Sequence, residues 1–228
     1  MKISLCLIVK NELQGCKTDV PKIPRDEFHE IFAVDGGSND GTIEYLNSVN
    51  IPVFPQPKIG LNAAYVYANE LASGDAVVAF FPKGTLPTDD LKKFRPHFNA
   101  GAQLIIASRQ LSNSSNEEDQ SFFRPRKWAV LALSILAYII WRREGVWIRD
   151  VLHGFKGWDK AAFRKMEVLD RGLSIDIEMV VRSYKLRLKR IEFPTKEVAR
   201  NYGETNFKFW PTGKKILIYL LYELARKN

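Results

Sequence analysis

Strand-like and helix-like segments alternate through the first half of the chain. Short apolar runs rich in β-branched and aromatic residues predict strands, and amphipathic stretches between them predict helices. The expected strands are 3–9, 30–34, 52–55, 76–81 and 103–107, and the expected helices are 42–49, 62–72 and 89–98. This alternation favours an α/β fold, with a mostly parallel sheet and helices on its faces.

Charge narrows the kinds of partner that the chain can have. Among its 228 residues, 34 are Lys or Arg and 26 are Asp or Glu, which gives a net charge of +8. Such a balance favours nucleic acid, phosphorylated small molecules or an acidic membrane face. Neither an aromatic RNA-binding strand nor a helix-turn-helix pattern accompanies the charge, so we expect no nucleic-acid partner.

The cysteines and histidines give no sign of a metal site. Cys6 lies inside an apolar run and Cys16 in the following loop, a spacing that matches no zinc or redox motif. The three histidines are scattered along the chain. The N-terminus opens directly into a strand pattern, so we expect no signal peptide and a reducing, cytosolic-side location.

Two apolar segments in the second half stand out. The first, WAVLALSILAYIIW (128–141), has basic residues on both sides. Its 14 residues are fewer than the roughly 20 that span a bilayer, so it is either a buried helix or one that lies in a membrane interface. The second, KKILIYLLYELARK (214–227), predicts an amphipathic helix that packs on the domain or attaches to a membrane.

The stretch VDGGSNDGT (34–42) is the most informative polar motif. A strand delivers Asp35 at its carboxyl end, two glycines permit a tight turn, and Thr42 opens a helix. Ligands bind in open α/β sheets where strands end, and a carboxylate there can accept from a base N–H or a ribose hydroxyl. An ordinary strand-to-helix turn capped by Asp and Ser is the alternative.

A lone lysine follows another expected strand. In AVVAFFPKGTLP (76–87) the apolar run stops at Pro82-Lys83-Gly84. Lys83 therefore lies where such a sheet binds its ligands.

Several of these stretches together resemble family 2 glycosyltransferases. VDGGSNDGT is similar to their nucleotide-binding turn, LIVKNE (7–12) to their first strand, and LASGD (71–75) to the segment before their metal-binding strand. ASRQ (107–110), RDVLHGFKGWDKAAF (149–163) and the stretch 174–208 follow in the order of the polyprenyl-phosphate branch, which includes dolichyl-phosphate mannose synthase. The resemblance covers nearly the whole chain.

The resemblance implies a single GT-A domain over 1–228. Its nucleotide-sugar-binding half would be 1–110, its acceptor-side half 111–212 with the apolar helix 128–141, and its C-terminal amphipathic helix 213–228. The activity implied is sugar transfer from a UDP- or GDP-linked donor to a polyprenyl phosphate. The protein would attach peripherally to the cytosolic membrane face, with an integral-membrane protein or a second copy as a further partner.

The same resemblance implies roles for individual residues. Glu12, Asp35 and Ser38 would hold the donor nucleotide, and Arg109 and Arg200 would approach phosphate oxygens. Asp150, Asp176 and Lys208 would lie at the acceptor phosphate or behind it. No general base is expected, because a phosphate acceptor is already an anion and mainly requires neutralisation of charge, which arginines supply. Each residue also has a plain structural alternative.

The chain departs from the family where the expected strand 76–81 ends. Family members carry an Asp-x-Asp there that holds a divalent metal, whereas this chain has Phe81-Pro82-Lys83 in register. Mg²⁺ or Mn²⁺ would lose its main oxygen ligands at this position. Three interpretations remain open: Lys83 replaces the metal, Asp89 and Asp90 contribute to a displaced metal site, or the protein binds its ligand without catalysing transfer.

Overall fold

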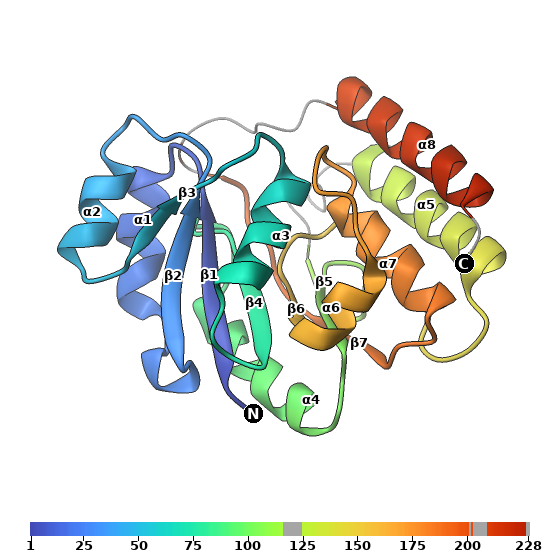
Figure 1. Cartoon of the computed structure of the whole chain (residues 1–228), viewed down its shortest axis with the longest axis horizontal. Coiled ribbons are helices and arrows are strands. Elements are labelled where there is room, and N and C mark those ends of the chain that lie inside the picture. Colours follow the sequence, from blue (N-terminus) through green and yellow to red (C-terminus); the bar gives the residue numbers. More distant parts are fainter. Residues whose placement is uncertain (116–124, 201, 203–208, 227–228) are drawn as a thin grey trace.

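The computed structural model describes residues 1–115, 125–200, 202 and 209–226 (Figure 1). The strands are β1 (Ile3–Val9), β2 (Glu30–Asp35), β3 (Val53–Pro55), β4 (Ala76–Phe80), β5 (Leu104–Ser108), β6 (Lys156–Asp159) and β7 (Arg190–Pro194). The α-helices are α1 (Leu13–Asp19), α2 (Thr42–Ser48), α3 (Leu61–Leu71), α4 (Phe94–Asn99), α5 (Pro125–Trp141), α6 (Lys160–Met166), α7 (Ile175–Lys185) and α8 (Phe209–Ala225). Three short 3-10 helices are η1 (Val20–Lys22), η2 (Arg25–Glu27) and η3 (Thr88–Lys93).

The described strands form one sheet in the order β3-β2-β1-β4-β6-β5-β7. All neighbouring pairs are parallel except those of β6, which runs antiparallel to both β4 and β5. The carboxyl ends of β1, β2, β4 and β5 therefore lie at the same edge of the sheet. The expectation of a mostly parallel α/β sheet is confirmed.

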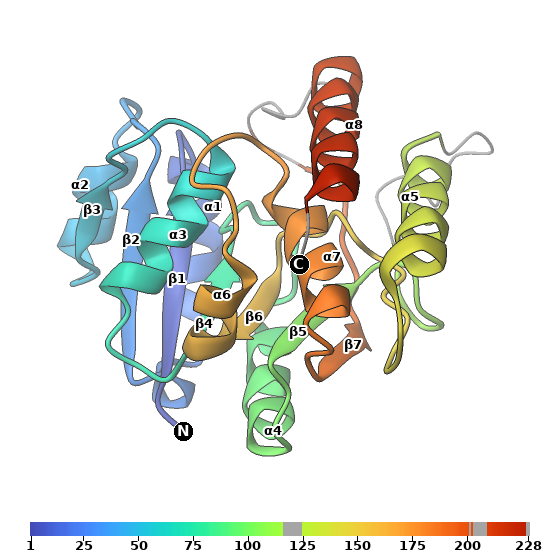
Figure 2. The same cartoon turned by 45° about the vertical axis from the view of Figure 1, so that its right-hand side comes forward.

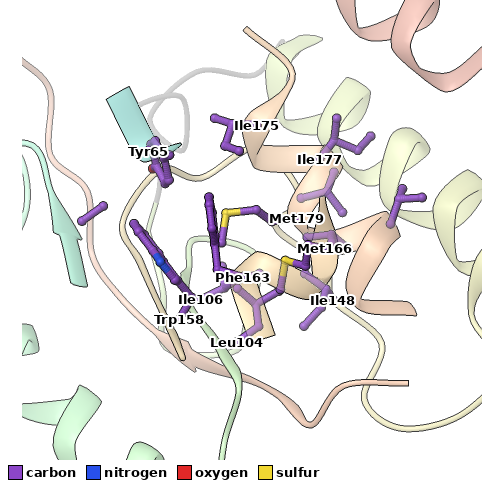
Figure 3. Packing of buried hydrophobic residues seen from close by; sticks show 14 of the residues in the cluster. Tyr65, Leu104, Ile106, Ile148, Trp158, Phe163, Met166, Ile175, Ile177 and Met179 are labelled. Atoms are coloured by element: carbon purple, nitrogen blue, oxygen red, sulfur yellow. The ribbon is translucent and has the colours of Figure 1, made fainter. Parts of the chain in front are cut away.

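Alternating side chains of the strands supply a separate core on each face of the sheet. Helices α3, α6 and α7 cover one face, and α5 and α8 add residues to the same core, which includes Cys6, Val77, Ala79 and Trp158. Helices α1, α2 and α4 cover the other, on Leu5, Leu7, Val78 and Phe80. In the first core, Tyr65 of α3 stacks on Trp158 of β6 with ring centroids 5.1 Å apart (Figure 3). A strand buried on both faces is a rigid support for the loop that follows it.

Several boundaries differ from the sequence-based expectation. The helix expected at 89–98 is instead η3 followed by α4. Pro96 explains the break, because its ring lacks an N–H and is tolerated only in the first turn of an α-helix. The expected strands agree with β1 to β5 within a residue or so at each end. Helices α1, α6 and α7 and strands β6 and β7 were not among the expected elements.

Helices α5 and α8 lie at the end of the molecule away from β2 and β3 (Figure 2). Helix α5 is not fully buried: Ala137 and Trp141 pack inward, while Trp128 and Ile139 are exposed. On α8, Tyr219 packs inward among other residues. The exposed apolar face of α8 consists of Leu217, Ile218, Leu221, Tyr222 and Leu224, each about half exposed. In the described part of the chain, no helix combines the length and hydropathy that crossing a bilayer requires.

Candidate active site

Backbone N–H groups after β1 donate hydrogen bonds to side-chain oxygens of the turn after β2. Asp35 is buried, and its carboxylate accepts from the backbone N–H groups of Gly37 (2.9 Å) and Ser38 (3.0 Å). The Ser38 hydroxyl accepts from the backbone N–H of Asn11 at 2.8 Å. Next to it, the backbone N–H of Glu12 donates to Thr42 Oγ1 at 2.9 Å. The three predicted nucleotide-binding residues, Glu12, Asp35 and Ser38, thus lie in one loop cluster.

Helix α1 and the turn after β4 pack so closely that a side chain at Gly15 would not fit. A Cβ on Gly15 would lie 2.1 Å from the carbonyl oxygen of Pro82. On the other side of Lys83, Gly84 has a φ of +71° and donates its N–H to Asp19 Oδ2 at 2.7 Å. Left-handed backbone favours glycine. The Lys83 backbone is therefore fixed by contacts on both sides.

Lys83 is a largely enclosed cation that has no counter-ion in the described part of the chain. Within the described residues its ammonium makes no hydrogen bond or ion pair, and it lies 4.9 Å from the centre of the Phe81 ring. Burial lowers the pKa of Lys83, and the negative charges of Glu12, Glu197 and Asp176 offset only part of that shift. An enclosed ammonium in this state is stabilised by an anionic ligand.

Arg109 is held by two carboxylates at once. Its Nε donates to Asp150 Oδ2 (2.8 Å), one terminal nitrogen to Asp150 Oδ1 (3.0 Å), and the other to Glu197 Oε2 (2.8 Å). Burial alone would raise the pKa of Asp150, but the ion pair and hydrogen bonds with Arg109 outweigh it and hold the pKa at about 2. Forked pairs of this kind are strong and rigid. Arg109 keeps two further N–H groups for a ligand, since a guanidinium has five.

Arg200 links the C-terminal part of the chain to Glu12 in the turn after β1. Its guanidinium forms an ion pair with Glu12. Burial raises the pKa of Glu12, and Arg200 and Lys83 offset part of that effect. A ligand that enters beside Lys83 therefore meets an Arg200–Glu12 pair as well.

Asp176, in the first turn of α7, pairs with Lys156 of β6 at 2.8 Å. Asp176 and Asp150 thus each contact a cation from another element, but they contact different cations. The predicted residue Lys208 lies outside the described residues.

The residues at the end of β4 do not fit a divalent metal. Asp89 pairs with Lys92 at 2.8 Å on the surface, and Asp90 pairs with Lys93 at 2.5 Å and accepts from the Thr195 hydroxyl. Across the described ranges, no group of three or more His, Cys, Asp or Glu side chains could hold a metal ion. Lys83 would also repel a divalent cation at this strand end.

Three residues of this region escaped the sequence interpretation: Gly15, Lys156 and Glu197. A lone lysine inside the apolar run FKGW was the available signal for Lys156, since a lysine there needs a buried partner. For Gly15 and Glu197 no local pattern points to the contacts that they make.

Comparisons with known proteins agree on one family and one fold. Residues 4–166 match the sequence model described as Glycosyl transferase family 2. Glycosyltransferase AglJ of Haloferax volcanii is 28% identical over 219 residues, covering 92% of this chain and 68% of that protein. A crystal structure of glucosyl-3-phosphoglycerate synthase from Mycobacterium tuberculosis with Mn²⁺, UDP and glucosyl-3-phosphoglycerate covers all of this chain, with a TM-score of 0.70 at 15% identity. This chain covers 81% of that structure. Another, with Mg²⁺ and UDP, has a TM-score of 0.72. The expected GT-A fold is confirmed.

Proposed function

The chain belongs to glycosyl transferase family 2, and from that premise we propose that it transfers a sugar from a UDP- or GDP-linked donor to a polyprenyl phosphate at a membrane surface. The observation that carries the proposal is Lys83, an enclosed cation that has no counter-ion among the described residues and lies at the edge of the sheet where donors bind. The M. tuberculosis synthase has been crystallised with UDP and Mn²⁺ or Mg²⁺. In this chain, Lys83 would replace the metal and neutralise the charge of the donor diphosphate.

The proposed reaction needs no general base. A phosphate oxygen of the acceptor attacks the anomeric carbon, the bond from that carbon to the diphosphate oxygen breaks, and the nucleoside diphosphate leaves with the electron pair. Charge grows on the leaving diphosphate, and a fixed cation beside it lowers the barrier. Lys83 suits this task because its backbone is held between Gly15 and Asp19. Arg109 and Arg200 would approach the remaining phosphate oxygens.

The lipid acceptor is supported by the exposed faces of α5 and α8. Apolar side chains such as Ile139, Ile218 and Leu221 are more than half exposed, and Lys214 and Lys215 lie exposed in α8. Apolar residues beside basic ones favour the interface of an anionic membrane. We therefore propose that the exposed faces of α5 and α8 bind a lipid surface.

Flotation with vesicles tests the membrane surface. We expect the protein to float with vesicles that contain phosphatidylglycerol at low salt. We expect the double variant Ile218→Glu, Leu221→Glu to bind at least about tenfold less, because each side chain contributes about 1.5–3 kcal/mol when buried in lipid. Ile59→Glu, an exposed isoleucine in the loop between β3 and α3, is the matched control. Equal flotation of the double variant and the control would contradict a membrane role for α8.

Transfer of labelled sugar tests the function itself. UDP-glucose or GDP-mannose is supplied to the protein with vesicles that contain a polyprenyl phosphate, and label is counted in the lipid extract. We expect label in the lipid with one of the two donors. The replacement of the expected acid pair by Phe81-Pro82-Lys83 favours one alternative, a glycosyltransferase-like binding protein that does not turn over. Binding of donor without labelled lipid would support that alternative.

A further inference from the structure

Lys156 is a lysine whose whole side chain is buried. It belongs to the short strand β6, where it lies opposite Ala79 of β4 and Ile106 of β5. Its neighbour two residues on, Trp158, packs in the core between the sheet and α3. An ammonium removed from water this completely is costly unless it is paired and hydrogen-bonded.

Among the residues that the structure describes, Asp176 alone pairs with Lys156. Lys156 Nζ lies 2.8 Å from Asp176 Oδ1 and donates to the Asp176 backbone carbonyl at 3.2 Å. Two contacts from one ammonium fix both the backbone and the carboxylate of the same residue. Asp176 also lies in the first turn of α7, where its negative charge meets the positive amino end of the helix.

Asp176 differs from Asp150, another buried carboxylate of this region, in how much of its side chain stays exposed. The Asp150 side chain has no exposed surface, and both its oxygens are taken by Arg109. The Asp176 side chain keeps 13% of its surface exposed while Lys156 keeps none. The charge of Asp176 also acts on Lys83. Lys156 lies opposite Ala79 of β4, the strand that leads to Lys83, so the Asp176 carboxylate that Lys156 contacts lies beside that strand.

We propose that Lys156 is a positioning residue that holds the Asp176 carboxylate toward the site, where Asp176 accepts a hydrogen bond from a hydroxyl of the donor sugar. This inference rests on the proposed function and adds the residue pair that recognises the sugar. A carboxylate only accepts hydrogen bonds and repels phosphate, so a sugar hydroxyl fits it and the diphosphate does not. In this arrangement Lys83 binds the diphosphate of the donor, and Asp176 binds its sugar.

Binding of donors with and without their sugar tests the proposal. Calorimetry with UDP-glucose and GDP-mannose, and with UDP and GDP as sugar-free controls, gives the affinity that the sugar adds. Asp176→Asn is expected to weaken the nucleotide sugar about tenfold, the usual loss for a hydrogen bond to a charged group, and to leave the nucleoside diphosphate within about twofold. Lys156→Met is expected to do the same, whereas Lys165→Met on the surface of α6 changes neither.

The double variant Lys156→Met, Asp176→Asn shows whether the lysine acts through the aspartate. It buries no unpaired charge, so it is expected to fold even where Lys156→Met alone does not. We expect it to bind the nucleotide sugar as Asp176→Asn does, with no further loss, because both changes remove one interaction. A further loss in the double variant, or an equal loss of UDP or GDP, would mean that Lys156 only supports the fold and would overturn the proposal.

The two proposals fail in different ways. Failure of wild-type protein to bind either nucleotide sugar would reject the proposed function and this inference together. Normal binding of the nucleotide sugar without labelled lipid would reject the transfer reaction. The affinity for UDP-glucose or GDP-mannose relative to that for UDP or GDP would still decide the role of Lys156.

Discussion

Replacing Lys83 with alanine is expected to lower sugar transfer by about a hundred- to a thousandfold, the usual effect of removing one group that stabilises charge in a transition state. The loss should lie mainly in kcat, because the charge on the diphosphate is largest when the bond to the sugar breaks. Lys92→Ala, in η3 on the surface, is the control and should keep wild-type rates. Wild-type turnover by Lys83→Ala would mean that another group neutralises the diphosphate.

The pH dependence of the transfer rate provides a second test of Lys83. Burial lowers the pKa of Lys83, so its positive charge is present at low pH and is lost at a lower pH than for an ordinary lysine. We therefore expect transfer to fall as the pH rises through that lowered pKa. Lys83→Arg stays charged over this range and should lack the fall. The same alkaline fall in the arginine variant would assign it to another group.

Removing the Asp150 carboxylate is expected to destabilise the protein by about 3 kcal/mol or more, the cost of breaking one side of a buried ion pair. Arg109 would keep only Glu197 as a partner. Asp150→Ala is measured by urea unfolding beside Glu27→Ala. The control breaks a partly exposed pair with Arg95 and should cost less than about 1 kcal/mol. Equal losses in the two variants would contradict the bracing role of Asp150.

The ion pair between Arg109 and Asp150 should also make the free energy of unfolding depend on pH in the acid range. The pKa of Asp150 in the folded protein is about 2, below its ordinary value of 3.8. Its contribution to stability is therefore complete above about pH 4 and is lost as the pH falls toward 2, a change on the order of 2 kcal/mol. The difference in unfolding free energy between wild type and Asp150→Ala should shrink over this range. A gap that stays constant down to pH 2 would contradict the depressed pKa.

Local pattern predicted strands β1 to β5 and one side of the site. Strands β1, β2 and β4 are apolar runs, and parallel pairing brings their carboxyl ends to one edge. Asn11-Glu12, Asp35 and Lys83 lie at or shortly after those ends. Position in an alternating pattern was therefore enough to place these residues together.

The partners of these residues could not be predicted in the same way. Arg109 and Asp150 are 41 residues apart, and Glu12 and Arg200 are 188 apart. Such pairs depend on how α5, β6 and β7 return to the sheet, and the antiparallel strand β6 has only four residues. A strand this short shows no clear periodicity, so neither its register nor the partner of Lys156 is contained in local sequence.

The central claim is that this family 2 glycosyltransferase moves sugar onto a polyprenyl phosphate with Lys83 at the diphosphate in place of a metal. The most direct measurement is the rate of transfer of labelled sugar into lipid in excess EDTA, with and without added Mn²⁺. The account predicts the same rate in EDTA as in Mn²⁺. Loss of transfer in EDTA that Mn²⁺ restores would contradict it.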